Sequence, residues 1–214
     1  MEKRIKDPVS AITHFIGFLA AIPATICLII KSFQEASIIH VAAFTIFGIS
    51  LLLLYGASTI YHALPVKKET EVKLRRIDHM MIFVLIAGTY TPVCLINLRG
   101  IVGWSLLALV WAFAIGGILL KIFWLNAPRW LSTAIYVIMG WLVVLAFYPL
   151  EKAVPMGGIA LLTAGGIVYT LGAVIYALKW PKFNFKRFGF HEIFHLFVMG
   201  GTALHTAFMF AYVL

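Results

Sequence analysis

Seven long apolar runs, separated by short polar links, divide this chain along its whole length. A run of about 20 apolar residues is long enough to cross the hydrocarbon core of a bilayer as a helix. The pattern therefore predicts an all-α integral membrane protein, a bundle of seven transmembrane helices. We expect the helices at residues 9–30, 37–64, 77–98, 101–124, 131–150, 157–178 and 190–214.

The composition leaves no room for a second, soluble domain. Hydrophobic residues make up 63% of the 214 residues and charged residues 12%, whereas a soluble domain is about half apolar and a quarter charged. Residues 1–214 are therefore expected to form a single membrane domain. Cys27 and Cys94 both lie inside apolar runs, which favours packing over a disulfide.

The basic residues predict how the chain is oriented. Fourteen Lys and Arg residues lie on one side of the expected membrane and three on the other, so the N-terminus is expected in the cytoplasm and the C-terminus outside. These charges sit around the short links and form no continuous basic stripe, which argues against nucleic-acid binding. We expect a multi-pass protein of the plasma membrane, in contact with membrane lipids. The fourteen are Lys3, Arg4, Lys6, Lys67, Lys68, Lys73, Arg75, Arg76, Lys121, Arg129, Lys179, Lys182, Lys186 and Arg187, and the three are Lys31, Arg99 and Lys152.

Three histidines are expected to meet near the inner leaflet. His191 and His195 are four residues apart at the start of the last run, and so lie on one helix face. His62 ends the second run on the same side of the membrane. Imidazole favours zinc, and three protein ligands with an open fourth position are typical of a catalytic Zn²⁺ site.

Two further polar residues fall at the same depth as this predicted zinc site. Asp78, at the start of the third run, could orient a water at the open position and take its proton. Ser58, one turn before His62, could bond a ligand or the substrate carbonyl. Each residue also has a structural interpretation: an interfacial histidine pair bonded to lipid phosphates, a helix-end histidine, a helix-dipole carboxylate, or a hydroxyl bonded to its own helix.

The remaining histidines are weaker candidates. His14 and His79 lie on the expected inner side and could support the site from outside the ligand set. His205 is about 15 Å of helical rise beyond His195, too far to share a metal with it. The string from His191 to His195 also matches the His-Glu-x-x-His motif of zinc proteases, with Glu192 as general base.

Taken together, these motifs resemble the haemolysin III family. This family is the bacterial branch of the group that contains the adiponectin and progestin receptors, and it is more broadly related to alkaline ceramidases. The resemblance implies seven helices, an inner N-terminus and a zinc held by the three histidines, with Asp78 contacting the zinc-bound water and Ser58 in the same cluster. The long N-terminal region of the receptor members is missing, which argues against hormone signalling. The motifs are Ser58-x-x-x-His62, Asp78-His79, Gly88-Thr89-Tyr90-Thr91-Pro92 and His191-x-x-x-His195.

Four functions follow from the sequence, and the first leads. It is a zinc-dependent hydrolase of lipid amides or esters at the inner leaflet. The second is a non-enzymatic protein of lipid sensing or membrane homeostasis whose zinc is structural. The third is a cytolytic or pore-forming protein, as the family name suggests. The fourth is an intramembrane protease that uses Glu192.

Overall fold

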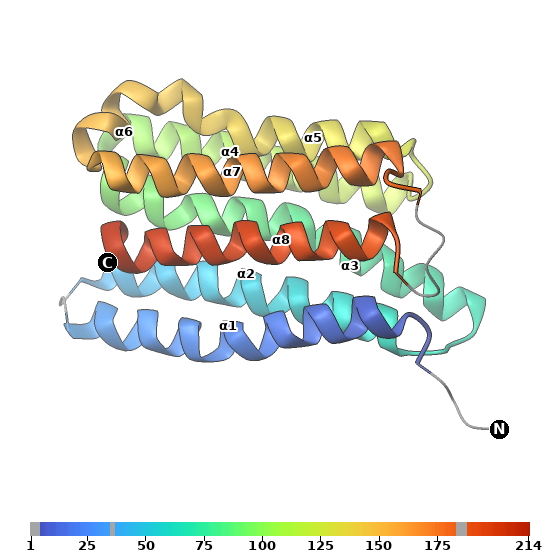
Figure 1. The fold of residues 1–214 in the computed structure, drawn as a ribbon. Coiled ribbons are helices and arrows are strands. Elements are labelled where there is room, and N and C mark those ends of the chain that lie inside the picture. Colours follow the sequence, from blue (N-terminus) through green and yellow to red (C-terminus); the bar gives the residue numbers. More distant parts are fainter. Residues whose placement is uncertain (1–4, 35–36, 183–187) are drawn as a thin grey trace.

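The computed structural model describes residues 5–34, 37–182 and 188–214, and these form a bundle of long helices lying side by side (Figure 1). Two spans end in a π-helical segment and one is interrupted by a 3₁₀ segment. The elements are α1 (Pro8–Gln34), α2 (Ile38–Ala63), α3 (Lys68–Pro92), η1 (Val93–Leu98), α4 (Gly100–Phe123), α5 (Arg129–Trp141), η2 (Leu142–Ala146), α6 (Phe147–Ala153), α7 (Met156–Leu178), α8 (Phe190–Phe208) and η3 (Met209–Val213).

Seven helical spans of the described chain are long and apolar enough to cross a membrane, as the sequence predicted. α3 with η1 forms one span, α5 with η2 and α6 another, and α8 with η3 the last. We call the end of the bundle where α1 begins the proximal end and the opposite end the distal end. α2 ends at the proximal end, and α3 and α8 begin there (Figure 1).

The third span starts earlier than the sequence suggested. α3 begins at Lys68 rather than at residue 77, so a charged helical extension precedes its apolar part. Hydropathy does not register such a segment, because its residues are polar. They are nevertheless strong helix formers, and Glu69 and Glu71 in the first turn interact favourably with the helix dipole. This extension brings several cations of α3 to the proximal end.

The fifth span is not a continuous α-helix. It runs from Arg129 to Ala153, and the 3₁₀ segment η2 interrupts it in the middle. Pro149 has no N–H, and its ring would clash with the carbonyl four residues earlier, so a regular α-helix cannot pass through this point undisturbed. The proline was visible in the sequence, but the break was not predicted.

α3 is the central helix of the bundle, since more than half of its apolar window is buried. On one side it packs with α1, α2 and α8 around buried residues such as Phe44 and Leu51. On the other side it packs with α4 and α5 around Phe83, Val110 and Met139. Large apolar side chains face outward on the remaining helix surfaces, as expected of a surface in contact with lipid.

The basic residues of the described chain gather at the two ends as the sequence indicated. Lys31, Arg99 and Lys152 lie toward the distal end, and the others toward the proximal end. Lys3, Arg4, Lys186 and Arg187 fall outside the described residues. Cys27 and Cys94 are both free, as predicted; Cys94 is buried in the bundle, whereas Cys27 is exposed on its outer surface.

Two adjacent glycines of α4 offer a matched test of this packing. A Cβ on Gly117 would lie 2.2 Å from the ring of Phe83, which is fully buried and has no room to move. A Cβ on Gly116 would meet nothing within 4 Å. We therefore expect Gly117→Ala to lower the free energy of unfolding by about 1–3 kcal/mol. Gly116→Ala should be neutral or slightly stabilising, because alanine favours helix. Thermal unfolding in detergent measures both, and equal stability of the two variants would contradict the packing.

Candidate metal centre

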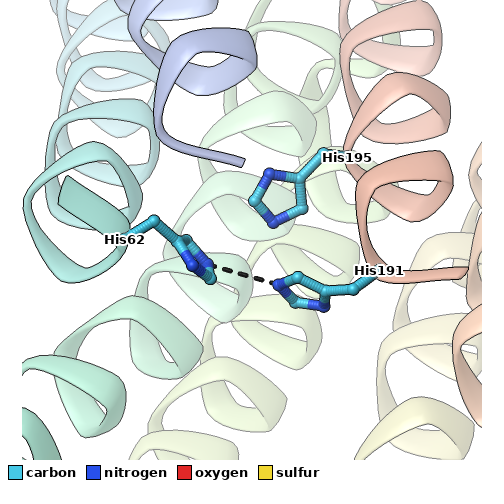
Figure 2. A group of neighbouring side chains, drawn as sticks. All are labelled: His62, His191 and His195. Carbon is cyan, nitrogen blue, oxygen red and sulfur yellow. Dashed lines mark hydrogen bonds between the residues drawn. The ribbon is translucent and has the colours of Figure 1, made fainter. Parts of the chain in front are cut away.

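Three histidine side chains from two helices converge at the proximal end. His62 belongs to the last turn of α2, and His191 and His195 to the first turns of α8. One ring nitrogen from each lies within 4.8 Å of the other two. Figure 2 shows the three rings facing a common point between the helices. The structure thus brings together all three predicted ligands, although 129 residues separate His62 from His191.

The spacing of the rings fits a metal ion. The Nε2 atoms of His62 and His191 are 3.3 Å apart (Figure 2). Two nitrogens bound to one tetrahedral zinc at 2.0–2.1 Å are themselves separated by about 3.3–3.4 Å. The same distance suits a hydrogen bond between a protonated and an unprotonated nitrogen. Either a metal ion or a proton can therefore lie between these two nitrogens. The three imidazoles could therefore hold a metal ion.

The chain just before α1 holds His62 from both its backbone and its ring. The Asp7 N–H donates to the His62 carbonyl over 2.9 Å. The Asp7 carboxylate oxygen Oδ2 lies 3.0 Å from His62 Nδ1. A carboxylate can only accept, so Nδ1 carries the proton and Nε2 presents its lone pair to the cluster. Such a carboxylate partner fixes both the tautomer and the ring orientation of a metal-binding histidine.

The first turns of α1 also support α8. Ser10 Oγ donates to Glu192 Oε1 over 2.8 Å, and Glu192 Oε2 accepts the Gly189 N–H over 2.8 Å. Glu192 thus caps the N-terminus of α8, the helix that carries two of the three histidines. The His14 ring stacks on the His195 ring, with centroids 3.7 Å apart. These contacts fix the position of α8 relative to α1 and α2.

Asp78 and Ser58 are both buried, and both line a cavity of about 710 Å³ that is also lined by His191 and His195. The Ser58 hydroxyl makes no hydrogen bond to its own helix, which removes the structural interpretation of this residue. It lies beside the Asp78 carboxyl. The predicted site residues therefore occupy one region of the proximal end, with a cavity next to the histidines.

His79 and His205 do not join the cluster of three. The His79 ring lines the same cavity, and its backbone carbonyl accepts a hydrogen bond from Tyr136. His205 Nε2 bonds the Leu162 carbonyl over 3.1 Å, deeper in the bundle. Both residues belong to the walls of the cavity rather than to the candidate metal site.

The supporting residues Asp7, Ser10 and His14 are the part of the site that the sequence did not reveal, apart from a general suggestion for His14. A signal was present. Ser10 and His14 are four residues apart, and Asp7 is three before Ser10, so all three fall on one face at the start of the first apolar run. Polar residues repeated on one face of a membrane helix indicate that this face meets another polar group.

Comparison of the sequence with known proteins identifies its family. A family model described as Haemolysin-III related matches residues 3–206, nearly the whole chain. The chain belongs to the haemolysin III family. This match agrees with the seven-span fold, and the matched range includes every residue of the candidate site.

Relatives in this family include close bacterial proteins. The chain is 45% identical to Hemolysin-3 of Bacillus cereus over 205 residues, which cover 95% of this chain and 90% of the relative. It is 46% identical to the Hemolysin-3 homolog of Bacillus subtilis (strain 168) over 200 residues, covering 93% and 91% of the two chains. A more distant relative is the Adiponectin receptor protein of Drosophila melanogaster, 22% identical over 232 residues, which are 90% of this chain and 47% of the receptor.

The contact between Asp7 and His62 can be tested through metal affinity. Asp7→Ala removes the acceptor for His62 Nδ1 but leaves the backbone bond to the His62 carbonyl in place. Loss of such a partner typically weakens metal binding about 10–100-fold, and we expect a decrease of this size. Competition with a fluorescent zinc chelator measures it on the purified protein. Glu69→Ala, which changes an exposed carboxylate of α3, serves as the control. Equal affinities in both variants would contradict the assigned role of Asp7.

Proposed function

We propose that this haemolysin III protein is a zinc-dependent hydrolase of lipid amides or esters. The observation that carries the proposal is that two of the three clustered histidines, His191 and His195, line the 710 Å³ cavity. A structural metal site is normally closed by protein ligands, whereas a catalytic site leaves one position open to substrate. A cavity of this size is within the range that encloses small-molecule ligands.

The donor set supports zinc as the metal. A ligand set of three imidazole nitrogens, without a thiolate or a carboxylate, favours zinc among the common divalent ions of proteins. Zinc held there would act as a Lewis acid toward an acyl carbonyl and toward water. The chain itself supplies the ligands, the residues that orient them and a cavity beside them.

Asp78 and Ser58 supply the remaining groups of the proposed reaction. Asp78 would orient a water molecule, accept its proton as the acyl bond is attacked, and return a proton to the departing amine or alcohol. The Ser58 hydroxyl, free of its own helix, can donate to the substrate carbonyl. Glu192 is already engaged by Ser10 and by the Gly189 N–H. Its capping role disfavours the protease alternative.

The proposed setting is the inner leaflet of the plasma membrane. The excess of Lys and Arg at the proximal end indicates that this end faces the cytoplasm. The N-terminus is then inside, and an odd number of crossings leaves the C-terminus outside. Lipid substrates would reach the cavity from the cytoplasmic half of the bilayer.

A second function, a zinc-stabilised protein that senses lipid without turnover, is supported by a different observation. The cluster joins α2 to α8, which are far apart in the sequence, so a metal there would also stabilise the bundle. The cytolysis suggested by the name of the Bacillus cereus relative is tested separately, since a pore-forming protein would release dye from liposomes that contain it.

Hydrolysis is tested with the full chain reconstituted in liposomes that contain a ceramide and an ester lipid. Fatty-acid release is measured by mass spectrometry, and bound zinc is measured on the same samples. Asp78→Asn should keep its zinc and lose about 10²–10⁴-fold in rate, the usual contribution of a general base. Glu69→Gln, an exposed carboxylate on the same helix, should retain full activity.

The outcomes separate the proposals. Full activity of the Asp78→Asn protein with zinc bound would remove Asp78 from the mechanism. A wild-type protein that carries zinc but releases no fatty acid from either lipid would contradict the hydrolase and favour the lipid-sensing function.

A further inference from the structure

A lysine lies buried in the cavity wall beside the candidate site. Lys121, in the last turn of α4, is only 3% exposed, and its ammonium group donates to Ser132 Oγ of α5. Arg75 of α3 and Arg129 of α5 line the same cavity. Lys121 lies close enough to Arg75 for their charges to interact. Arg129 lies close enough to His191 for the same to hold. Four cations line the cavity in all. Lys179 is exposed, whereas the other three are buried or half-buried and come from three different helices at one end of the cavity.

These cations have little negative charge to balance them. None of the ion pairs among the described residues involves Lys121, Arg75 or Arg129. Asp78 is the one carboxylate among the described residues that line the cavity. Arg75 donates to the Asn126 side chain over 2.7 Å, and Arg129 lies over the Tyr176 ring, so both rest on neutral groups.

Part of the hydrogen-bonding capacity of this cationic end is unused. Arg75 Nε and Arg129 Nη1 are buried and have no hydrogen-bond partner among the described residues. Lys121 is buried, and Arg75 and Arg129 are half-buried. A buried cation without a counter-ion is costly, and an anion held between these three groups would offset that cost. Guanidinium groups bind phosphate and carboxylate through paired N–H bonds.

The general excess of positive charge on one side of a membrane protein does not account for Lys121. Lysines placed by that rule extend to the interface and keep their charge in water. Lys73 of α3 is exposed in this way, and so are Lys67 and Lys68. Lys121 instead points inward and is covered by protein. Its position identifies the cationic end as a built feature of the cavity.

Apolar surface continues from the cations into the bundle. The cavity follows α3 from Arg75 to Tyr90, a helical rise of roughly 22 Å. That length exceeds the hydrocarbon depth of one leaflet, about 15 Å. A second cavity of about 250 Å³ shares Thr89, Tyr90 and His205 with the first and is lined mainly by apolar residues such as Phe147 and Leu162. The space is therefore charged at one end and apolar along the rest.

We propose that this cavity binds a lipid with a phosphate headgroup, whose phosphate contacts Lys121, Arg75 and Arg129 and whose acyl chain extends along α3. A phosphate presents several anionic oxygens in different directions, which suits three cations that approach from three helices. A carboxylate offers only two oxygens in one plane. The inference concerns binding alone, so it does not depend on the hydrolase proposed above and survives if that activity is absent.

Binding is measured by native mass spectrometry and by competition with a fluorescent lipid, on the purified full chain. The probes are phosphatidic acid, phosphatidylcholine, oleate and inorganic phosphate. Phosphatidic acid should bind at least about tenfold more tightly than phosphatidylcholine, which carries no net charge, or oleate, because charge-assisted hydrogen bonds contribute about 1.4 kcal/mol or more. Inorganic phosphate at millimolar concentration should not displace it.

Four variants form two matched pairs, each with one cation of the cavity lining and one cation outside it. The lysine pair is Lys121→Met with Lys73→Met, and the arginine pair is Arg75→Gln with Arg76→Gln. Lys121→Met and Arg75→Gln should each weaken phosphatidic acid binding about tenfold. Lys73→Met and Arg76→Gln change cations outside the cavity lining and should bind as the wild type does. Lys121→Arg keeps the charge and should retain binding, which separates loss of the site from loss of the fold.

Several results would overturn the proposal. Equal loss of binding in both members of each pair would mean that anionic lipid binds to the surface in general. Equal affinity for oleate would assign the cations to a carboxylate, and equal affinity for inorganic phosphate would show that the acyl chain contributes nothing. Unchanged binding in folded Lys121→Met protein would remove the lysine from the site.

Discussion

Buried imidazole nitrogens need partners, and the proximal end of this bundle is arranged to provide them. Inside an apolar bundle no water satisfies a ring nitrogen, so each one left unpaired raises the free energy of the folded state. Asp7 engages one nitrogen of His62, and His62 in turn faces His191. A shared metal would satisfy the nitrogens that these contacts leave free. The contacts between α1, α2 and α8 at the proximal end meet part of this requirement.

α1 contributes no predicted ligand, yet it holds the cluster together. Asp7, just before its first residue, contacts the end of α2, and Ser10 and His14 in its first turns contact the start of α8. Support of this kind fixes the direction of a ligand lone pair, which decides metal affinity and specificity as much as the identity of the ligands does. The first helix of the chain is therefore part of the site, although it supplies support rather than a ligand.

Hydropathy and charge were enough to predict the number of spans and the meeting of His62 with His191 and His195. The number of spans follows from the thickness of the bilayer. The meeting of the histidines follows because successive helices end on alternate sides of the membrane. The start of α3 and the break before Pro149 were not predicted, because they depend on local helix propensity and backbone geometry. Contacts of Asp7 were missed since neither spacing nor hydropathy tells which helices are neighbours. Lys121 was counted among the link charges, but it is buried in the cavity wall.

The proposed catalytic site depends on a metal ion that bridges α2 and α8. Its most direct test is the metal content of protein purified without chelator, measured by inductively coupled plasma mass spectrometry for the wild type, His62→Ala and His191→Ala. We expect about one zinc ion per chain in the wild type and loss of zinc in both variants, since each removes one of three ligands. A wild-type protein without metal would contradict the account, and the histidines would then be partners for one another and for lipid.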